Sequence, residues 1–172
     1  MRRVWESAAE LGKRRSTGSG NVAKGGTKLA AVKAMAWGPA GALYASDGTR
    51  ILRAGSDGVL KEVAKLHGDV IERLYTSADG NALVWGLAVD AGGVVYAAVP
   101  AMGKVLRIAA DVKQEVIARS EDGWTAIGVA VFGSRVFLLE CKTALRSNYG
   151  PRVRRLIGDG KSEVLGVVNP EP

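Results

Sequence analysis

Short runs in which apolar and polar residues alternate fill most of the chain beyond residue 33. Alternation with a period of two places apolar side chains on one face of an extended segment, as in a half-buried β-strand. Glycine-rich turns separate the runs, and one of them is Asp57-Gly58. An Asp-Gly pair favours a tight hairpin because type I′ turns need positive φ at both central positions. The pattern therefore predicts many short strands joined by hairpins.

These strands belong to an internal repeat. Residues 35–45 align without a gap with residues 87–97, and a third copy at residues 129–138 is one residue shorter at its turn. The aromatic position of the three copies holds Tyr44, Tyr96 and Phe137. The second half of each copy begins at Arg50, Lys104 or Arg152. A turn and a fourth apolar run follow each time, so the repeating unit has four short strands.

Four strands in a period of roughly 40 to 55 residues are typical of a β-propeller blade. The small residues Ala36, Ala88 and Ala130 suit the innermost strand, because blades crowd together at the axis. The predicted fold class is therefore all-β: a partial β-propeller of about three four-stranded antiparallel blades plus a half blade. A sandwich or barrel built from the same strands is the alternative.

We expect the whole chain to form a single propeller segment. Its predicted parts are a partial blade with its connection (1–33), three blades (34–83, 84–125 and 126–166) and a tail (167–172). The N-terminal residues match the second half of a blade, and a short helix at residues 5–15 is the alternative. Nothing before Met1 supplies the first two strands of that blade. The expectation is a truncated propeller, not a closed ring.

Composition adds few constraints on function. The chain has 172 residues, a formal net charge of +7 and 23 glycines, which fits a basic, turn-rich globular domain. The basic surface is compatible with an anionic partner or with simple solvation. Cys141 is the only cysteine, so an internal disulfide is excluded. No apolar run is long enough for a membrane span, and no secretory signal follows Met1, so the compartment stays open.

The repeat resembles a known family. Residues 86–96, 127–140 and 151–155 resemble the NHL-type repeat, and the broader group is the six-bladed gluconolactonase-like and senescence-marker-like propellers. The resemblance covers about residues 34 to 166 and implies that this chain is the C-terminal part of a six-bladed ring. It also implies a divalent metal, such as calcium, held by Glu, Asn and Asp. The family's Asn before an innermost-strand Gly is replaced here by Trp85 and Ile127, so we expect no metal site or other cofactor.

The sequence partly matches several catalytic and nucleotide-binding motifs, but none of them has the neighbouring residues or predicted elements that it needs. Residues 18–23 fit a dinucleotide fingerprint without the strand, helix and acidic residue that it needs. Residues 160–162 end like a phosphate-binding loop but lack its first glycine. His67 is the only histidine, and neither a serine elbow nor a convincing partner for Cys141 accompanies it. We therefore predict no catalytic residues.

One face of the predicted propeller gathers the candidate ligand-binding residues. Loops between second and third strands share that face with the connections between blades, and loops on a rigid scaffold carry function. The candidates at the channel mouth are Asp47, Trp85, Trp124, Glu140, Arg146, Asn148 and Tyr149. They suit a protein or a small anionic or sugar-like ligand. The alternative is that the two tryptophans plug the axis and the other side chains are solvated.

Two main hypotheses for function follow. The first is a non-enzymatic binding or scaffold module, and the alternative is the remnant of a metal-dependent hydrolase or lyase of the gluconolactonase-like group. Binding of anions or nucleic acid through the basic surface is a third hypothesis. An open arc also leaves blade faces uncovered, which predicts self-association through residues such as Trp37, Tyr44, Val136 and Phe137.

Overall fold

The computed structural model describes residues 27, 29, 32–66, 84–121, 123–144, 147–158 and 160–168. The strand-or-helix question at residues 5–15, His67 and Arg146 lie outside the described residues. Within the described part no helix is long and apolar enough to cross a membrane.

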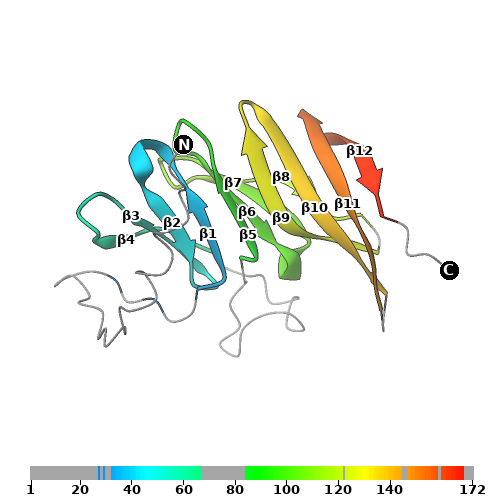
Figure 1. The fold of residues 1–172 in the computed structure, drawn as a ribbon, viewed down its shortest axis with the longest axis horizontal. Coiled ribbons are helices and arrows are strands. Elements are labelled where there is room, and N and C mark those ends of the chain that lie inside the picture. Colours follow the sequence, from blue (N-terminus) through cyan, green and yellow to red (C-terminus); the bar gives the residue numbers. More distant parts are fainter. Residues whose placement is uncertain are drawn as a thin grey trace, which may run out of the picture.

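Three four-stranded antiparallel sheets make up the fold (Figure 1). The first sheet contains β1 (Ala34–Trp37), β2 (Leu43–Ser46), β3 (Arg50–Ala54) and β4 (Leu60–Lys65). The second contains β5 (Gly86–Val89), β6 (Val95–Val99), β7 (Lys104–Ile108) and β8 (Gln114–Arg119). The third contains β9 (Trp124–Phe132), β10 (Arg135–Ala144), β11 (Ser147–Gly158) and β12 (Lys161–Val167). Each sheet follows chain order, so the predicted all-β partial propeller is confirmed.

The sheets stand side by side in sequence order, and their first strands bring them together (Figure 1). β1 contacts β5, and β5 in turn contacts β9. Where β5 meets β9, a Cβ on Gly86 would lie 2.6 Å from the Cα of Gly128. Only a residue without a side chain fits such a backbone approach. The first strands are therefore the innermost strands of the arc, as expected for blades around an axis.

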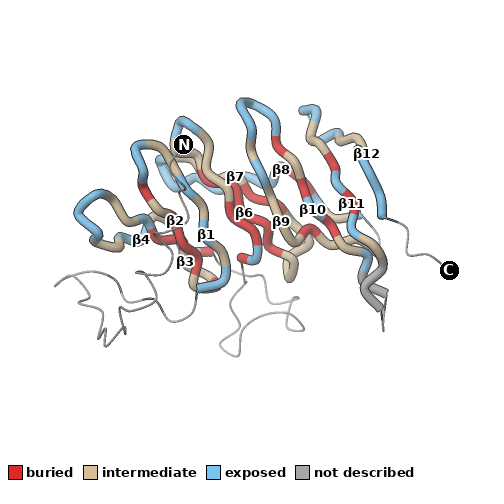
Figure 2. The backbone as a smooth tube through the Cα atoms, viewed as in Figure 1, coloured by how far each residue is buried: buried red, intermediate tan, exposed pale blue. Residues whose placement is uncertain are grey.

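Two layers of apolar side chains fill the spaces between the sheets, and Figure 2 shows the buried segments concentrated there. Tyr44 and Ile51 of the first sheet pack with Val95 and Leu106 of the second. The layer between the second and third sheets contains Tyr96, Val105, Ala126, Val136 and Leu138. Tyr44 and Val136, which we expected on uncovered faces, are instead core residues. They face the neighbouring sheet because alternation along their strands turns them toward it.

The uncovered apolar surface lies on the side of the third sheet that faces away from the second. We call it the outer face, and it includes Phe132, Leu139, Val153 and Ile157, all of them exposed. These side chains alternate with the inward-facing Leu138 along the same sheet. On the first sheet the outward-facing Ala45 and Leu52 are buried, but Met35 and Trp37 are 62% and 71% exposed. Most of the large exposed apolar side chains among the described residues therefore lie on the third sheet, with a smaller group on the first.

The three sheets share the same irregularity in their hydrogen-bonded ladders, so the sequence repeat is also a structural repeat. In every sheet the ladder between third and fourth strands skips one residue of the fourth strand. The skipped residues are Val63, Ile117 and Leu165. Such a β-bulge increases local twist, so the same bend recurs at the rim of each blade. Equivalent positions of the three sheets can therefore be compared residue by residue.

Candidate functional site

Loops from neighbouring parts of the chain meet at one end of the sheets. Leu66 N–H, just after β4, donates to Thr49 O, just before β3, at 2.8 Å. Ser120 N–H donates to Gly103 O at the same distance in the second sheet. Val84 N–H, at the start of the second blade, donates to Gly48 O of the first at 2.8 Å. The second-to-third-strand loops therefore share this end with the connections between blades.

One repeat position near this end of each sheet has different chemistry in the three copies. Glu140 of β10 pairs in register with Arg152 of β11. The alignment places Asp47 at the same position in the first sheet, where it forms an ion pair with Arg50. In the second sheet the position holds Val99, paired with Lys104. An acid facing a base is thus present in two of the three blades.

In the third sheet this pair grows into a cluster of four charged residues, Glu121, Glu140, Arg152 and Arg154, which we call the Glu140 cluster. Arg152 Nε donates to Glu140 Oε2 at 2.7 Å, and its Nη2 donates to Glu121 Oε2 at 2.7 Å. Arg154 Nη1 donates to Glu121 Oε1 at 2.6 Å, and its Nη2 lies 2.9 Å from Glu140 Oε1. The last contact is an ion pair without hydrogen-bond geometry, since Glu140 Oε1 accepts no hydrogen bond. Two acids and two bases therefore neutralise one another.

Burial makes these contacts unusual. Glu140 is completely buried, and the side chains of Arg152 and Arg154 are 7% and 5% exposed. Arg154 occupies the place of Leu52 and Leu106 in the other sheets, so a guanidinium stands where the repeat has core leucines. Desolvated charges need partners of opposite charge, and each buried side chain of the cluster has two of them.

Trp124 borders the cluster. Its ring lies 4.1 Å from the guanidinium carbon of Arg152, at a distance that allows a cation–π contact. Burial lowers the pKa of Arg152, but the hydrogen bonds that it donates to Glu121 and Glu140 outweigh burial and raise it. The hydrogen bond from Arg152 is the main reason why the pKa of Glu121 is lowered. Glu121 is about half exposed, so it forms the solvent-facing edge of the cluster.

The structure brings together two of the predicted site residues, Trp124 and Glu140. Trp85 is 56% exposed and lies just before β5, at the same end of the preceding blade. Asp47 belongs to the separate pair in the first sheet. The backbones of Asn148 and Tyr149 pair with β10 within β11, so they lie in a strand and not in the long loop we expected.

Sequence reasoning missed Glu121, Arg152 and Arg154 as members of a site. The signal available was the alternation at residues 152–155, which predicts an ordinary strand. Comparing the three repeat copies is more informative, because the position that holds leucine in the first two copies holds Arg154 in the third. A charge at a repeat position that is otherwise apolar requires a buried partner.

The carboxylates that the structure describes at this end do not fit a divalent metal. Among the described residues no group of three His, Cys, Asp or Glu side chains could hold an ion. Both oxygens of Glu140 face guanidinium groups, and Asp47 faces Arg50. A hard cation needs several free oxygen ligands, and cationic neighbours oppose its binding.

Comparisons with known proteins show the fold. No family model and no curated protein matches the chain. A gluconolactonase from Xanthomonas campestris is similar in structure, with a TM-score of 0.59, 18% identity, and coverage of 82% of this chain and 48% of that one. A virginiamycin B lyase from Staphylococcus aureus has a TM-score of 0.50 and 13% identity, with 77% and 40% covered. This chain spans about half the length of the solved structures that it matches, and it shares their propeller fold.

Proposed function

We propose that this chain is a non-enzymatic binding segment of an NHL-type, gluconolactonase-like propeller, and that it binds a neutral sugar-like ligand beside Trp124. The observation that carries the proposal is the charge balance of the Glu140 cluster. General acid–base catalysis needs a carboxyl group that is free to exchange a proton with the substrate. Glu140 is buried between two guanidinium groups instead, which suits a rigid support.

The surroundings of the cluster favour a neutral ligand over an anionic one. Arg152 and Arg154 are already paired with carboxylates, so neither offers an unbalanced positive charge. Trp124 is held by its contact with Arg152, and Trp85 presents a largely exposed ring at the same end of the preceding blade. Aromatic rings beside fixed hydrogen-bonding groups are typical of sites that bind polar ligands with apolar faces. The half-exposed Glu121 supplies carboxylate oxygens for ligand hydroxyl groups.

Tryptophan fluorescence and calorimetry with methyl glucoside test this proposal. We expect saturable binding in the millimolar range that weakens at least tenfold in Trp124→Leu. Trp37→Leu is the matched control, because Trp37 is exposed at the far end of β1 and should leave binding unchanged.

The enzymatic alternative is tested in the same preparation. Gluconolactone hydrolysis would be followed with and without calcium. Activity that needs calcium and disappears in Glu140→Gln would overturn the proposal and favour the hydrolase alternative. A failure of methyl glucoside to bind would contradict the sugar-like ligand.

A further inference from the structure

One repeat position of the first sheet breaks an electrostatic pattern kept by the other two. The third strands carry an arginine at the same register: Arg53, Arg107 and Arg155. Their partners across the fourth strands are Lys61, Glu115 and Glu163. The first sheet therefore places two cations opposite each other where the others place a cation and an anion.

The two regular positions form ion pairs. Arg107 Nη1 lies 3.6 Å from Glu115 Oε2, and Arg155 Nη2 lies 2.5 Å from Glu163 Oε1. In the described part of the chain, neither Arg53 nor Lys61 forms an ion pair or a side-chain hydrogen bond. Like charges directly opposite each other across an antiparallel ladder are destabilising. The Arg53–Lys61 pair therefore lacks the counter-ion that its equivalents have.

The charge of the neighbouring turn does not restore the balance. The sequence between third and fourth strands contains an aspartate in every copy: Asp57, Asp111 and Asp159. With all charged turn residues counted, including Lys113 in the second sheet, the set in the first sheet has one excess positive charge and the set in the second is neutral. The first blade thus keeps an excess positive charge that the second blade lacks.

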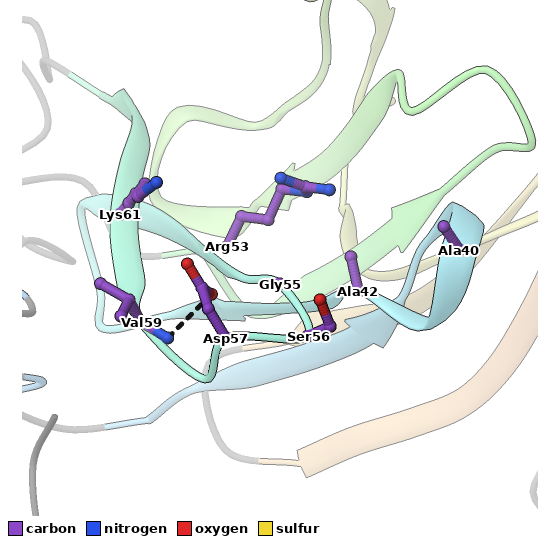
Figure 3. A pocket seen from close by; sticks show the side chains of 8 residues that line it. All are labelled: Ala40, Ala42, Arg53, Gly55, Ser56, Asp57, Val59 and Lys61. Atoms are coloured by element: carbon purple, nitrogen blue, oxygen red, sulfur yellow. Dashed lines mark hydrogen bonds between the residues drawn. The ribbon is translucent and has the colours of Figure 1, made fainter.

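A hollow of about 280 Å³ lies beside this pair, at the opposite end of the sheets from the Glu140 cluster. Figure 3 shows Arg53, Lys61 and Asp57 around it, with the short side chains of Ala40 and Ala42 beside them. Asp57 Oδ1 accepts a hydrogen bond from Val59 N–H at 3.1 Å, which fixes the turn (Figure 3).

The hollow has room and donors for more than a simple ion. Gly55 and Ser56 complete its lining, and Ser56 adds a hydroxyl group. Arg53 also borders a second hollow between the first and second sheets, lined by Tyr44 and Gly93 among others. The remainder of a ligand held at Arg53 can therefore extend between the blades.

We propose that the hollow binds the oxyanion group, phosphate or carboxylate, of a small ligand between Arg53 and Lys61. A guanidinium fork and an ammonium group together provide the geometry and the charge that oxyanions need. The bound anion replaces the glutamate found in the other two blades and removes the repulsion within the pair. Because the site lies at the other end of the sheets, it does not depend on the function proposed above.

Titrations with inorganic phosphate and with acetate at constant ionic strength test the inference. The wild-type chain should bind one of them saturably, with a dissociation constant in the millimolar range, and the amide NMR signals of Gly55 and Ser56 should shift. Lys61→Glu rebuilds the ion pair of the other blades, so it should weaken binding at least tenfold and raise the melting temperature at low salt. Lys113→Glu, an exposed turn residue of the second sheet, makes the same change in net charge and should leave binding unchanged.

The outcomes of these titrations distinguish a phosphorylated ligand from a carboxylate ligand, and they also show whether the site exists. Phosphate binding alone assigns a phosphorylated ligand, and acetate binding assigns a carboxylate. Equal binding by wild type and Lys61→Glu would overturn the inference, as would an absence of binding by both anions. Arg53→Gln provides a second variant at an exposed position, and binding that survives this change would also contradict the site.

Discussion

The Glu140 cluster allows a sharp prediction because the protein contains its own apolar counterpart. The second sheet has Val99 where the third has Glu140, and it has Leu106 where the third has Arg154. A double variant, Glu140→Val with Arg154→Leu, therefore copies a solution that the same fold already uses. It removes one acid and one base, and it leaves Arg152 paired with the half-exposed Glu121.

The expected magnitudes follow from burial. Glu140 is 0% exposed, so Glu140→Val leaves two desolvated guanidinium groups to share Glu121, and it should cost about 3 to 5 kcal/mol. Arg154→Leu leaves Glu140 paired with Arg152 and should cost about 1 to 3 kcal/mol. The double variant should lie within about 1 kcal/mol of wild type or be more stable, because apolar replacement of a buried ion pair is often neutral or stabilising.

Urea unfolding monitored by circular dichroism would measure all four proteins of this double-mutant cycle. We expect a coupling energy of at least about 2 kcal/mol between positions 140 and 154. A cost below about 1 kcal/mol for Glu140→Val would show that the cluster behaves like a solvated surface pair. Additive single costs would show that the two side chains do not act as a buried unit. Either result would refute the reasoning.

Three further predictions concern other parts of the arc. The lowered pKa of Glu121 contributes stability above its ordinary pKa and loses it as pH falls through the folded value, so Glu121→Gln should flatten acid destabilisation below about pH 4.5. An unchanged melting profile between pH 6 and pH 3 would contradict this. Gly86→Ala places a methyl group against the backbone of Gly128 and should cost about 1 to 3 kcal/mol in thermal unfolding, whereas Gly166→Ala, with open space around it, should cost nothing measurable. The outer face should cause self-association in sedimentation at micromolar concentration, and Ile157→Lys should reduce it; a monodisperse wild-type monomer would show that this surface is not adhesive.

The fold could be predicted from the sequence because its determinants are local and repeated. The alignment of residues 35–45 with 87–97 became equal registers in the first and second sheets, including the pairs Ala36–Tyr44 and Ala88–Tyr96. Turn signals such as Asp57-Gly58 marked the hairpin without knowledge of distant contacts, but the type I′ expectation was wrong, since only Gly58 of the pair has positive φ. Strand lengths in the third sheet were less accessible, because Asn148 and Tyr149 look like loop residues until their pairing with β10 is seen.

The candidate site was harder to predict from the sequence than the fold, because it depends on which charged side chains point toward the neighbouring sheet. Glu140 and Trp124 were found from their expected place at one end of the blades. The partners of Glu140 were not, because Arg152 and Arg154 alternate as in any exposed strand and only the structure shows that their side facing the second sheet is buried. Whether an arginine is solvated or buried depends on the side of the sheet to which its side chain points, and the residue type does not reveal that side.

A hydrogen bond that joins the residue after each fourth strand to the third strand, or to the residue just before it, has a consequence for folding. Leu66 bonds to Thr49 and Ser120 bonds to Gly103, and Val168 N–H donates to Pro151 O at 2.9 Å in the third sheet. Every blade is thus closed by residues close to it in sequence, before the chain reaches the next blade. Contacts of short sequence separation form quickly because little loop entropy is lost in making them. We therefore expect blades to form one after another as the chain emerges during synthesis, with each finished sheet serving as the surface on which the following one assembles.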